Sequence, residues 1–264
     1  MTPNHTFAIL AYKESPHLSA CIQSLKNQLQ KSEIIICTST PSPFLRNIAT
    51  ENNLPLFINP RQAGIASDWN FAISKSFTQY VTLAHQDDIY FPEYSQEVIK
   101  AAKARADALI IFSNYDEIVH KSSQILIRKN SLNFFIKKCI NLLFFRTTSY
   151  LTKYKTHFIA LGNSIGCPTV TFKKDNLRDF EFDENFSVNL DWKAWFDLSK
   201  KVGSFIWINK TLVSHRIYNN SETSQGLAEN RRQKEDLEMF MKLWPSFIAR
   251  LISKLYSLSY KNNN

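Results

Sequence analysis

Residues 80–88 read YVTLAHQDD, an apolar run that ends in two adjacent carboxylates. We predict a buried strand over residues 80–84, with His85-Gln86-Asp87-Asp88 lying where this strand stops. Two neighbouring aspartates at the end of a buried strand are costly to desolvate without a counter-ion. A divalent cation that bridges a diphosphate is one such counter-ion, because Mg²⁺ typically takes one or two carboxylates plus phosphate oxygens. The alternative interpretation is an aspartate pair that caps the next helix.

Strands and helices alternate around this segment. Further strands are predicted at residues 7–11, 33–37, 54–58 and 109–113. Helices are predicted at 18–29, 65–77 and 92–106, the first with Ser15-Pro16 as its N-cap and first-turn proline. This alternation predicts a doubly wound α/β sheet, which binds ligands outside the carboxyl ends of its strands. The ends of that kind are residues 11–14, 38–40 and 85–88.

Length and composition limit the classes of protein that fit. The chain has 264 residues, 44% of them hydrophobic, which suits one large α/β domain with an appended helical piece. A formal net charge of +9 suits an anionic partner such as nucleic acid, a nucleotide or an anionic membrane face. The four cysteines have no C-x-x-C spacing, which argues against zinc and disulfides and favours a reduced, cytoplasmic compartment. We expect no signal peptide and no spanning helix, which needs ~20 apolar residues.

Three segments of the second half carry candidate functional residues. Asp191 precedes a predicted amphipathic helix near residues 190–201, where it is either an N-cap or a general base for a hydroxyl group. Residues 163–169 (NSIGCPT) are typical of a substrate loop and equally of a plain connecting turn. His215 or Arg216 is suited to contact a diphosphate, although an arginine on a surface loop is the more common case.

Together these segments resemble family 2 glycosyltransferases of the GT-A fold. FAILAYKES with HLSACIQSLKNQ is similar to the family's opening nucleotide-binding unit, and NPRQAGIASDWNFAISKS is similar to its glycine-containing stretch. YVTLAHQDDIYFPEY resembles the family's aspartate-rich motif, and FDENFSVNLDWKAWFDLSKKVGSFIWINKTLVSHRI resembles its acceptor half. The resemblance covers roughly residues 6–225 in the family's order and spacing, which is more specific than any one motif.

The resemblance implies a role for each candidate. Asp87 and Asp88 are expected to hold a divalent metal, Mg²⁺ or Mn²⁺, together with the diphosphate of a nucleotide-sugar. Asp191 is expected to be the catalytic base of an inverting transfer. The expected nucleotide contacts are Ala11, Tyr12, Lys13, Glu14, Thr38, Asp68, Gln86 and Asp87.

The chain also departs from the family's pattern at several positions. Thr38-Ser39-Thr40 replaces an acidic pair that contacts the nucleobase in the family. This segment therefore has no aspartate with which to recognise uridine. His85 replaces the first acid of the metal motif, and Leu190-Asp191 replaces Glu-Asp. Tyr218 stands where a late histidine is often found, which argues against a metal ligand in that loop.

We therefore expect a GT-A-like glycosyltransferase domain over residues 1–225, divided into a nucleotide-sugar-binding half (1–115) and an acceptor half (116–225). A C-terminal helical extension follows at 226–264, with its helices broken at Pro245. The expected reaction moves a sugar from a nucleotide-sugar to a saccharide or lipid-linked saccharide in surface polysaccharide synthesis, without a nucleic-acid partner. The alternatives are a nucleotidyltransferase on a similar sheet and a non-enzymatic basic protein that binds membrane or RNA.

Residues 127–155 combine basic and large apolar side chains. The basic ones are Arg128, Lys129, Lys137, Lys138, Arg146, Lys153 and Lys155. The apolar run is too short to span a bilayer, but a basic, aromatic-rich helix can lie in the plane of an anionic membrane surface. We therefore expect peripheral association with the inner face of the plasma membrane. The alternative is a helix that packs on the sheet with solvated lysines.

Overall fold

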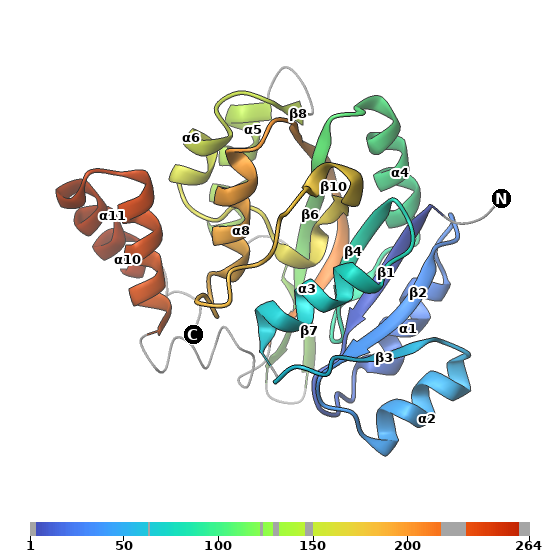
Figure 1. Ribbon diagram of the computed structural model, residues 1–264. Coiled ribbons are helices and arrows are strands. Elements are labelled where there is room, and N and C mark those ends of the chain that lie inside the picture. Colours follow the sequence, from blue (N-terminus) through green and yellow to red (C-terminus); the bar gives the residue numbers. More distant parts are fainter. Residues whose placement is uncertain are drawn as a thin grey trace.

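The computed structural model (Figure 1) describes residues 4–62, 64–121, 124–128, 132–145, 150–217 and 231–258. Its strands are β1 (His5–Leu10), β2 (Glu33–Thr38), β3 (Leu56–Ile58), β4 (Tyr80–His85), β5 (Ile89–Tyr90), β6 (Ala108–Lys121), β7 (Gln124–Arg128), β8 (Tyr150–Leu151), β9 (Thr171–Lys173) and β10 (Ser204–Ile217). Its helices are α1 (Leu18–Lys26), α2 (Pro43–Asn52), α3 (Ile65–Lys75), α4 (Tyr94–Ala104), α5 (Leu132–Phe145), α6 (Lys155–Ala160), α7 (Lys174–Leu177), α8 (Leu190–Ser199), α10 (Arg231–Leu243) and α11 (Ser246–Leu258). A short 3₁₀ turn, η1, covers Cys167–Thr169.

These strands form one sheet in the order β3-β2-β1-β4-β9-β6-β10-β5, with β7 paired to β6 and β8 paired to β10. The four strands β3, β2, β1 and β4 run parallel to one another, and β6 and β10 are parallel to each other. Helices cover both faces (Figure 1). The predicted α/β sheet built around parallel strands is therefore confirmed. One feature was not predicted: β9, from the second half of the chain, inserts antiparallel between β4 and β6.

Local periodicity predicted most elements of the first half. The strands β1 to β4 begin and end within two residues of their predicted bounds, whereas the strand predicted at 109–113 is the 14-residue β6. The break of the tail helices at Pro245 is also confirmed. The predicted N-cap Ser15 is not the N-cap of α1: that residue is His17, and the Ser15 hydroxyl donates to Asp87 instead.

The sheet separates two hydrophobic cores because side chains alternate across each strand. On β4, Val81 and Leu83 belong to one core, while Tyr80 and Ala84 belong to the other. The first core includes some of the largest buried side chains of the second half of the chain, among them Trp192, Trp195, Phe158 and Phe205. The second core packs α1, α2 and α4 on the opposite face around Phe7, Tyr90 and Tyr94. The carboxyl ends of the central strands are thereby held rigidly at one edge.

We predict that Gly203→Ala destabilises the fold. Gly203 precedes β10 with φ of 135°, and a Cβ there would lie 2.6 Å from the Asp107 carbonyl oxygen. Backbone strain and this clash should lower the free energy of unfolding by about 2–3 kcal/mol, measured by urea denaturation. Gly64→Ala is the control, because its φ of −172° is extended and no atom lies within 4 Å of the added Cβ. Equal losses in both variants would contradict the prediction.

Candidate active site

The chain turns sharply after β4, and Asp88 lies in this turn with none of its side chain exposed. Its Oδ1 accepts a hydrogen bond from the backbone N–H of Arg216 at 2.9 Å and another from His215 Nδ1 at 2.9 Å. Both partners come from β10, because β5 pairs with β10 so that Ile89 lies opposite Ser214. The sheet register therefore supplies the groups that a buried carboxylate needs.

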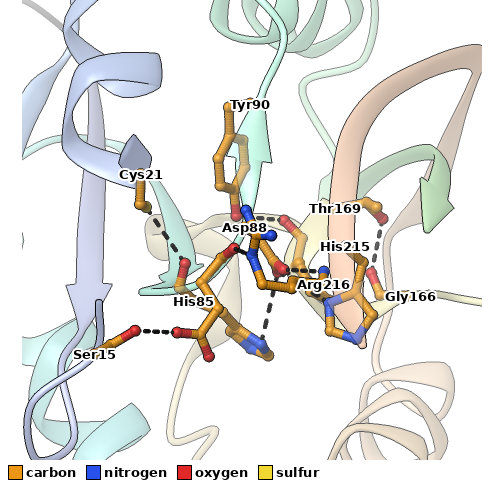
Figure 2. Close-up of polar contacts among 11 residues, drawn as sticks. Ser15, Cys21, His85, Asp88, Tyr90, Gly166, Thr169, His215 and Arg216 are labelled. Atoms are coloured by element: carbon orange, nitrogen blue, oxygen red, sulfur yellow. Dashed lines mark hydrogen bonds and ion pairs between the residues drawn. The ribbon is translucent and has the colours of Figure 1, made fainter. Parts of the chain in front are cut away.

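His85, Asp88 and His215 converge on one point (Figure 2). One ligand atom from each of them lies within 4.8 Å of the others, a spacing at which they could hold a metal ion. His85 Nδ1 lies 3.9 Å from Asp88 Oδ2. Its other ring nitrogen, Nε2, is buried and has no hydrogen-bond partner in the part of the chain that the structure describes. Imidazole nitrogens are ligands for divalent transition metals, whereas Mg²⁺ prefers oxygen ligands such as a carboxylate.

The three groups also shift one another's pKa. Burial by itself would raise the pKa of Asp88, but His215, His85 and the Arg216 N–H together hold it below its ordinary value. Burial lowers the pKa of His85, and His215 adds to this effect. Burial by itself would lower the pKa of His215, but the carboxylate of Asp88 outweighs this effect and the pKa of His215 is raised. At neutral pH Asp88 is therefore an anion.

Asp87 faces the opposite side of the turn. Its Oδ1 accepts a 2.5 Å hydrogen bond from Ser15 Oγ, and its carbonyl oxygen accepts one from Arg216 Nε at 3.1 Å. Gln86 next to it bonds both backbone groups of Tyr12: the Tyr12 N–H donates to Oε1 at 3.2 Å, and Nε2 donates to the Tyr12 carbonyl at 2.9 Å. The end of β4 is thus tied to the loop after β1, where the sequence predicted a ligand edge.

The loop after β1 is itself tied to the end of β2. The Ala11 N–H donates to the Cys37 carbonyl, and Lys13, at φ of 54°, donates its N–H to Thr40 Oγ1 at 2.7 Å. Thr38 is buried, and its Oγ1 accepts the Thr40 N–H. The predicted contact Glu14 is exposed beside them.

Asp68 connects this edge to α3. Its Oδ2 accepts from Ser39 Oγ at 2.7 Å and its Oδ1 accepts from Asn59 Nδ2 at 2.8 Å. Asp68 was placed by resemblance, and the structure brings it to the carboxyl ends of β2 and β3. Ala11 to Lys13, Thr38, Asp68 and Gln86 to Asp88 therefore belong to one continuous edge.

Asp191 lies in the first turn of α8, whose N-cap is Asn189, so the interpretation of Asp191 as the N-cap is wrong. Its Oδ2 accepts from Asn163 Nδ2 at 2.8 Å and its Oδ1 accepts from the Trp192 N–H at 2.7 Å. Burial raises the pKa of this carboxyl, although Asn163, the Trp192 N–H and the cations Arg232 and Lys137 act in the opposite direction. A carboxylate with a raised pKa is suited to accept a proton near neutral pH.

Residues 163–169 lie between the two acidic groups. Asn163 donates a hydrogen bond to Asp191. Burial raises the pKa of Cys167, four residues later, and the charges of Asp191 and Asp88 raise it further. Gly166 is required by close packing, since a Cβ there would lie 2.7 Å from the Tyr115 ring. Residues 163–169 therefore include a direct contact with the Asp191 carboxylate through Asn163.

Comparison with known proteins agrees with this geometry. The sequence profile of Glycosyl transferase family 2 matches residues 6–170. The chain belongs to this family. No curated protein matches it in sequence.

Solved structures with the same fold are distant in sequence. Residues 1–349 of TarS from S. aureus share 12% identity with the chain at a TM-score of 0.60, over 82% of this chain and 60% of that one. The same TarS fragment in complex with UDP-GlcNAc shares 13% identity at a TM-score of 0.61, over 85% of this chain and 61% of that one. The mannosyltransferase PcManGT from Pyrobaculum calidifontis, in complex with GDP-Man and Mn²⁺, shares 13% identity at a TM-score of 0.65, over 97% of this chain and 70% of that one. The chain spans about 60% of the length of the TarS fragment.

Sequence reasoning missed part of this family 2 site. His85 was taken only as a replacement for an acid, and His215 only as one of two diphosphate candidates, yet both side chains flank Asp88. Two histidines near predicted strand ends were the available signal, but their meeting depends on the β5–β10 register. Tyr218 and the residues 218–230 lie outside the described part of the chain.

Proposed function

We propose that this chain is an inverting, nucleotide-sugar-dependent glycosyltransferase acting on a saccharide or lipid-linked saccharide acceptor in surface polysaccharide synthesis. The observation that carries the proposal is the pairing of two acidic groups across residues 163–169. Asp88 is buried just after β4, and Asp191 lies in the first turn of α8 with a raised pKa. Transfer needs both: one group to support the departing diphosphate, and one to deprotonate the attacking hydroxyl.

The residues around Asp88 fit a divalent metal such as Mg²⁺ or Mn²⁺. The fit rests on ligand atoms of His85, Asp88 and His215 that lie within 4.8 Å of one another. It rests also on the buried Nε2 of His85, which has no hydrogen-bond partner among the described residues. Asp87, the neighbouring carboxylate, is proposed to share the metal–diphosphate. When bound, the ion supplies Lewis-acid stabilisation of the negative charge on the departing diphosphate. The PcManGT complex, which has the same fold, contains Mn²⁺.

The nucleotide is proposed to bind along the continuous edge from Ala11 to Lys13, at Thr38 and at Asp68, with Glu14 and Gln86 at its border. Ser39 and Asn59 hold the Asp68 carboxylate in place, so it is presented as a fixed acceptor of hydrogen bonds. Tyr12, fixed through its backbone by Gln86, offers an exposed ring. An aromatic ring and a fixed carboxylate suit stacking and hydrogen bonding of a nucleoside.

The chemical step follows from Asp191. Its carboxylate takes the proton of the acceptor hydroxyl while that oxygen attacks the anomeric carbon from the face opposite the diphosphate. A new carbon–oxygen bond forms, and the bond to the diphosphate breaks, with its electron pair leaving on the nucleotide. Asn163 holds one carboxylate oxygen and the Trp192 N–H holds the other, which fixes the orientation of the base.

We predict that Asp88→Asn abolishes metal-dependent binding of a nucleoside diphosphate. The amide removes the anion between the two histidines, and Mn²⁺ binding measured by calorimetry should fall at least tenfold, together with transfer. Asp175→Asn is the matched control, because Asp175 is an exposed aspartate bonded to Gln79 at the opposite end of β4. Native Mn²⁺ affinity in Asp88→Asn would refute the metal assignment.

We predict that Asp191→Asn lowers turnover about 10²–10⁴-fold with little change in the affinity for nucleoside diphosphate. In the native protein, turnover should fall as the pH drops through the raised pKa of Asp191, because only the anion accepts a proton. Asp197→Asn, on the same helix and paired with Lys193, is the control and should keep its turnover. Loss of donor affinity at unchanged turnover would contradict the role of Asp191.

Membrane association is supported by α5, which has two different faces. On one face Lys137 donates to Tyr115 Oη at 2.7 Å, and the Tyr115 ring lies 6.2 Å from that of His215. On the other, the exposed side chains are Phe135, Ile136, Lys138, Cys139, Leu142 and Leu143. The helix contains no acidic residue. Lys129 and Arg146, which the sequence also assigned to this basic segment, lie outside the described residues. The assignment of Lys155 to this surface is wrong, because Lys155 is buried and donates to the Lys201 and Gly203 carbonyl oxygens. No helix of the described part is long and apolar enough to cross a membrane.

A helix that lines the site with one face and exposes apolar side chains and Lys138 on the other suits a lipid-linked acceptor at an anionic surface. We predict that the protein co-sediments with anionic vesicles at low salt and that Phe135→Glu/Leu143→Glu removes most of this binding. These side chains are 66% and 69% exposed. The control, Phe77→Glu/Val202→Glu, changes side chains that are 87% and 98% exposed elsewhere on the surface. Equal sedimentation of both variants would refute the membrane assignment and leave the transferase assignment intact.

A further inference from the structure

The turn in front of α8 is held by a carboxylate from the C-terminal hairpin of α10 and α11. Glu235 Oε1 accepts hydrogen bonds from the N–H and the hydroxyl of Ser187 at 3.0 and 2.9 Å. Its Oε2 accepts from the N–H groups of Val188 and Asn189 at 2.9 and 2.7 Å. Both oxygens are therefore fully used on one turn, two to four residues before Asp191 in the chain.

The neighbouring residue of α10 strengthens the attachment. Asn189 is the N-cap of α8, but its side chain makes no capping bond to the helix. Its amide instead donates to Asp236 Oδ1 at 2.7 Å, and both residues are buried. The free N–H groups at a helix start favour a negative charge, and here α10 supplies that charge from outside the helix.

Side-chain packing fixes the same turn from its inner face. The Trp192 ring lies 5.0 Å from that of Phe240 on α10 and 6.0 Å from that of Tyr256 on α11. Its Nε1–H donates to the Ile159 carbonyl on α6. Figure 1 shows the hairpin beside α6 and α8. The backbone before Asp191 and the side chain after it are thus both held by the hairpin.

We propose that Glu235 is a positioning residue for Asp191, so that the C-terminal hairpin is part of the acceptor side of the active site. This inference rests on the proposed function, in which Asp191 is the base. Glu235 touches no reacting atom, and it acts by fixing where the first turn of α8 points the Asp191 carboxylate. Small displacements of a catalytic group are costly, since about 1 Å can reduce the rate 10²-fold.

The experiment uses Glu235→Gln in the full chain, below the measured Tm of every variant. Glutamine has the same shape, but its NH₂ group faces backbone N–H donors and cannot accept their bonds. We expect kcat to fall about 10- to 100-fold, with the KM for the nucleotide-sugar unchanged within about twofold. Glu238→Gln, on the same helix and paired with Lys242, is the matched control and should retain native kcat.

A double-mutant cycle tests whether Glu235 works through Asp191. If it does, adding Glu235→Gln to Asp191→Asn causes no further loss of kcat, because the positioned group is already disabled. A full additional loss in that background, native kcat in folded Glu235→Gln, or a parallel loss of donor affinity would each overturn the proposal. Glu235→Asp keeps the charge on a shorter side chain and should give an intermediate kcat; it carries the test if the glutamine variant does not fold. Native turnover in Asp191→Asn alone would instead refute the proposed function.

Discussion

The candidate site depends on the burial of one carboxylate. Asp88 is fully removed from solvent at the end of β4, and an anion in that position is tolerated only with several donors around it. Those donors come from the end of β10, which reaches Asp88 through its pairing with the two-residue strand β5. The burial of this carboxylate therefore connects the end of β4 to the end of β10.

The surroundings of Asp191 are assembled from segments far apart in the chain. Asp191 on α8 receives Asn163 from the loop before η1, while α10 holds the turn in front of it. Lys137 on α5 approaches from a third direction through Tyr115. Each of these groups is polar and partly buried, so that the removal of one leaves its partner without compensation. A site of this kind is rigid because its polar groups hold one another in place.

The sequence predicted the elements whose pattern is local. Strand ends near Thr38 and His85 followed from apolar runs that stop, and the tail helices followed from their spacing and Pro245. Three features were not predictable in this way. They are the insertion of β9, the proximity of His85 to His215, and the hydrogen bonds of Glu235 to residues 187–189. Each depends on which segments become neighbours in the sheet or the bundle, and periodicity carries no information about partners. Asp68 was placed by the resemblance, and the structure brings it to the carboxyl ends of β2 and β3.

The parallel pairing of β6 with β10 has a consequence for how the protein is made. These strands begin at residues 108 and 204, with α5, α6 and α8 between them in the chain. Closing so long a loop is opposed by chain entropy, and contacts of this kind form late in folding. During synthesis on the ribosome Asp88 emerges well before His215 and Arg216, and until they arrive it remains an ordinary hydrated side chain at an open sheet edge. The nascent protein thus acquires β1 to β4 early, and the surroundings of Asp88 are complete only after β10 has been translated.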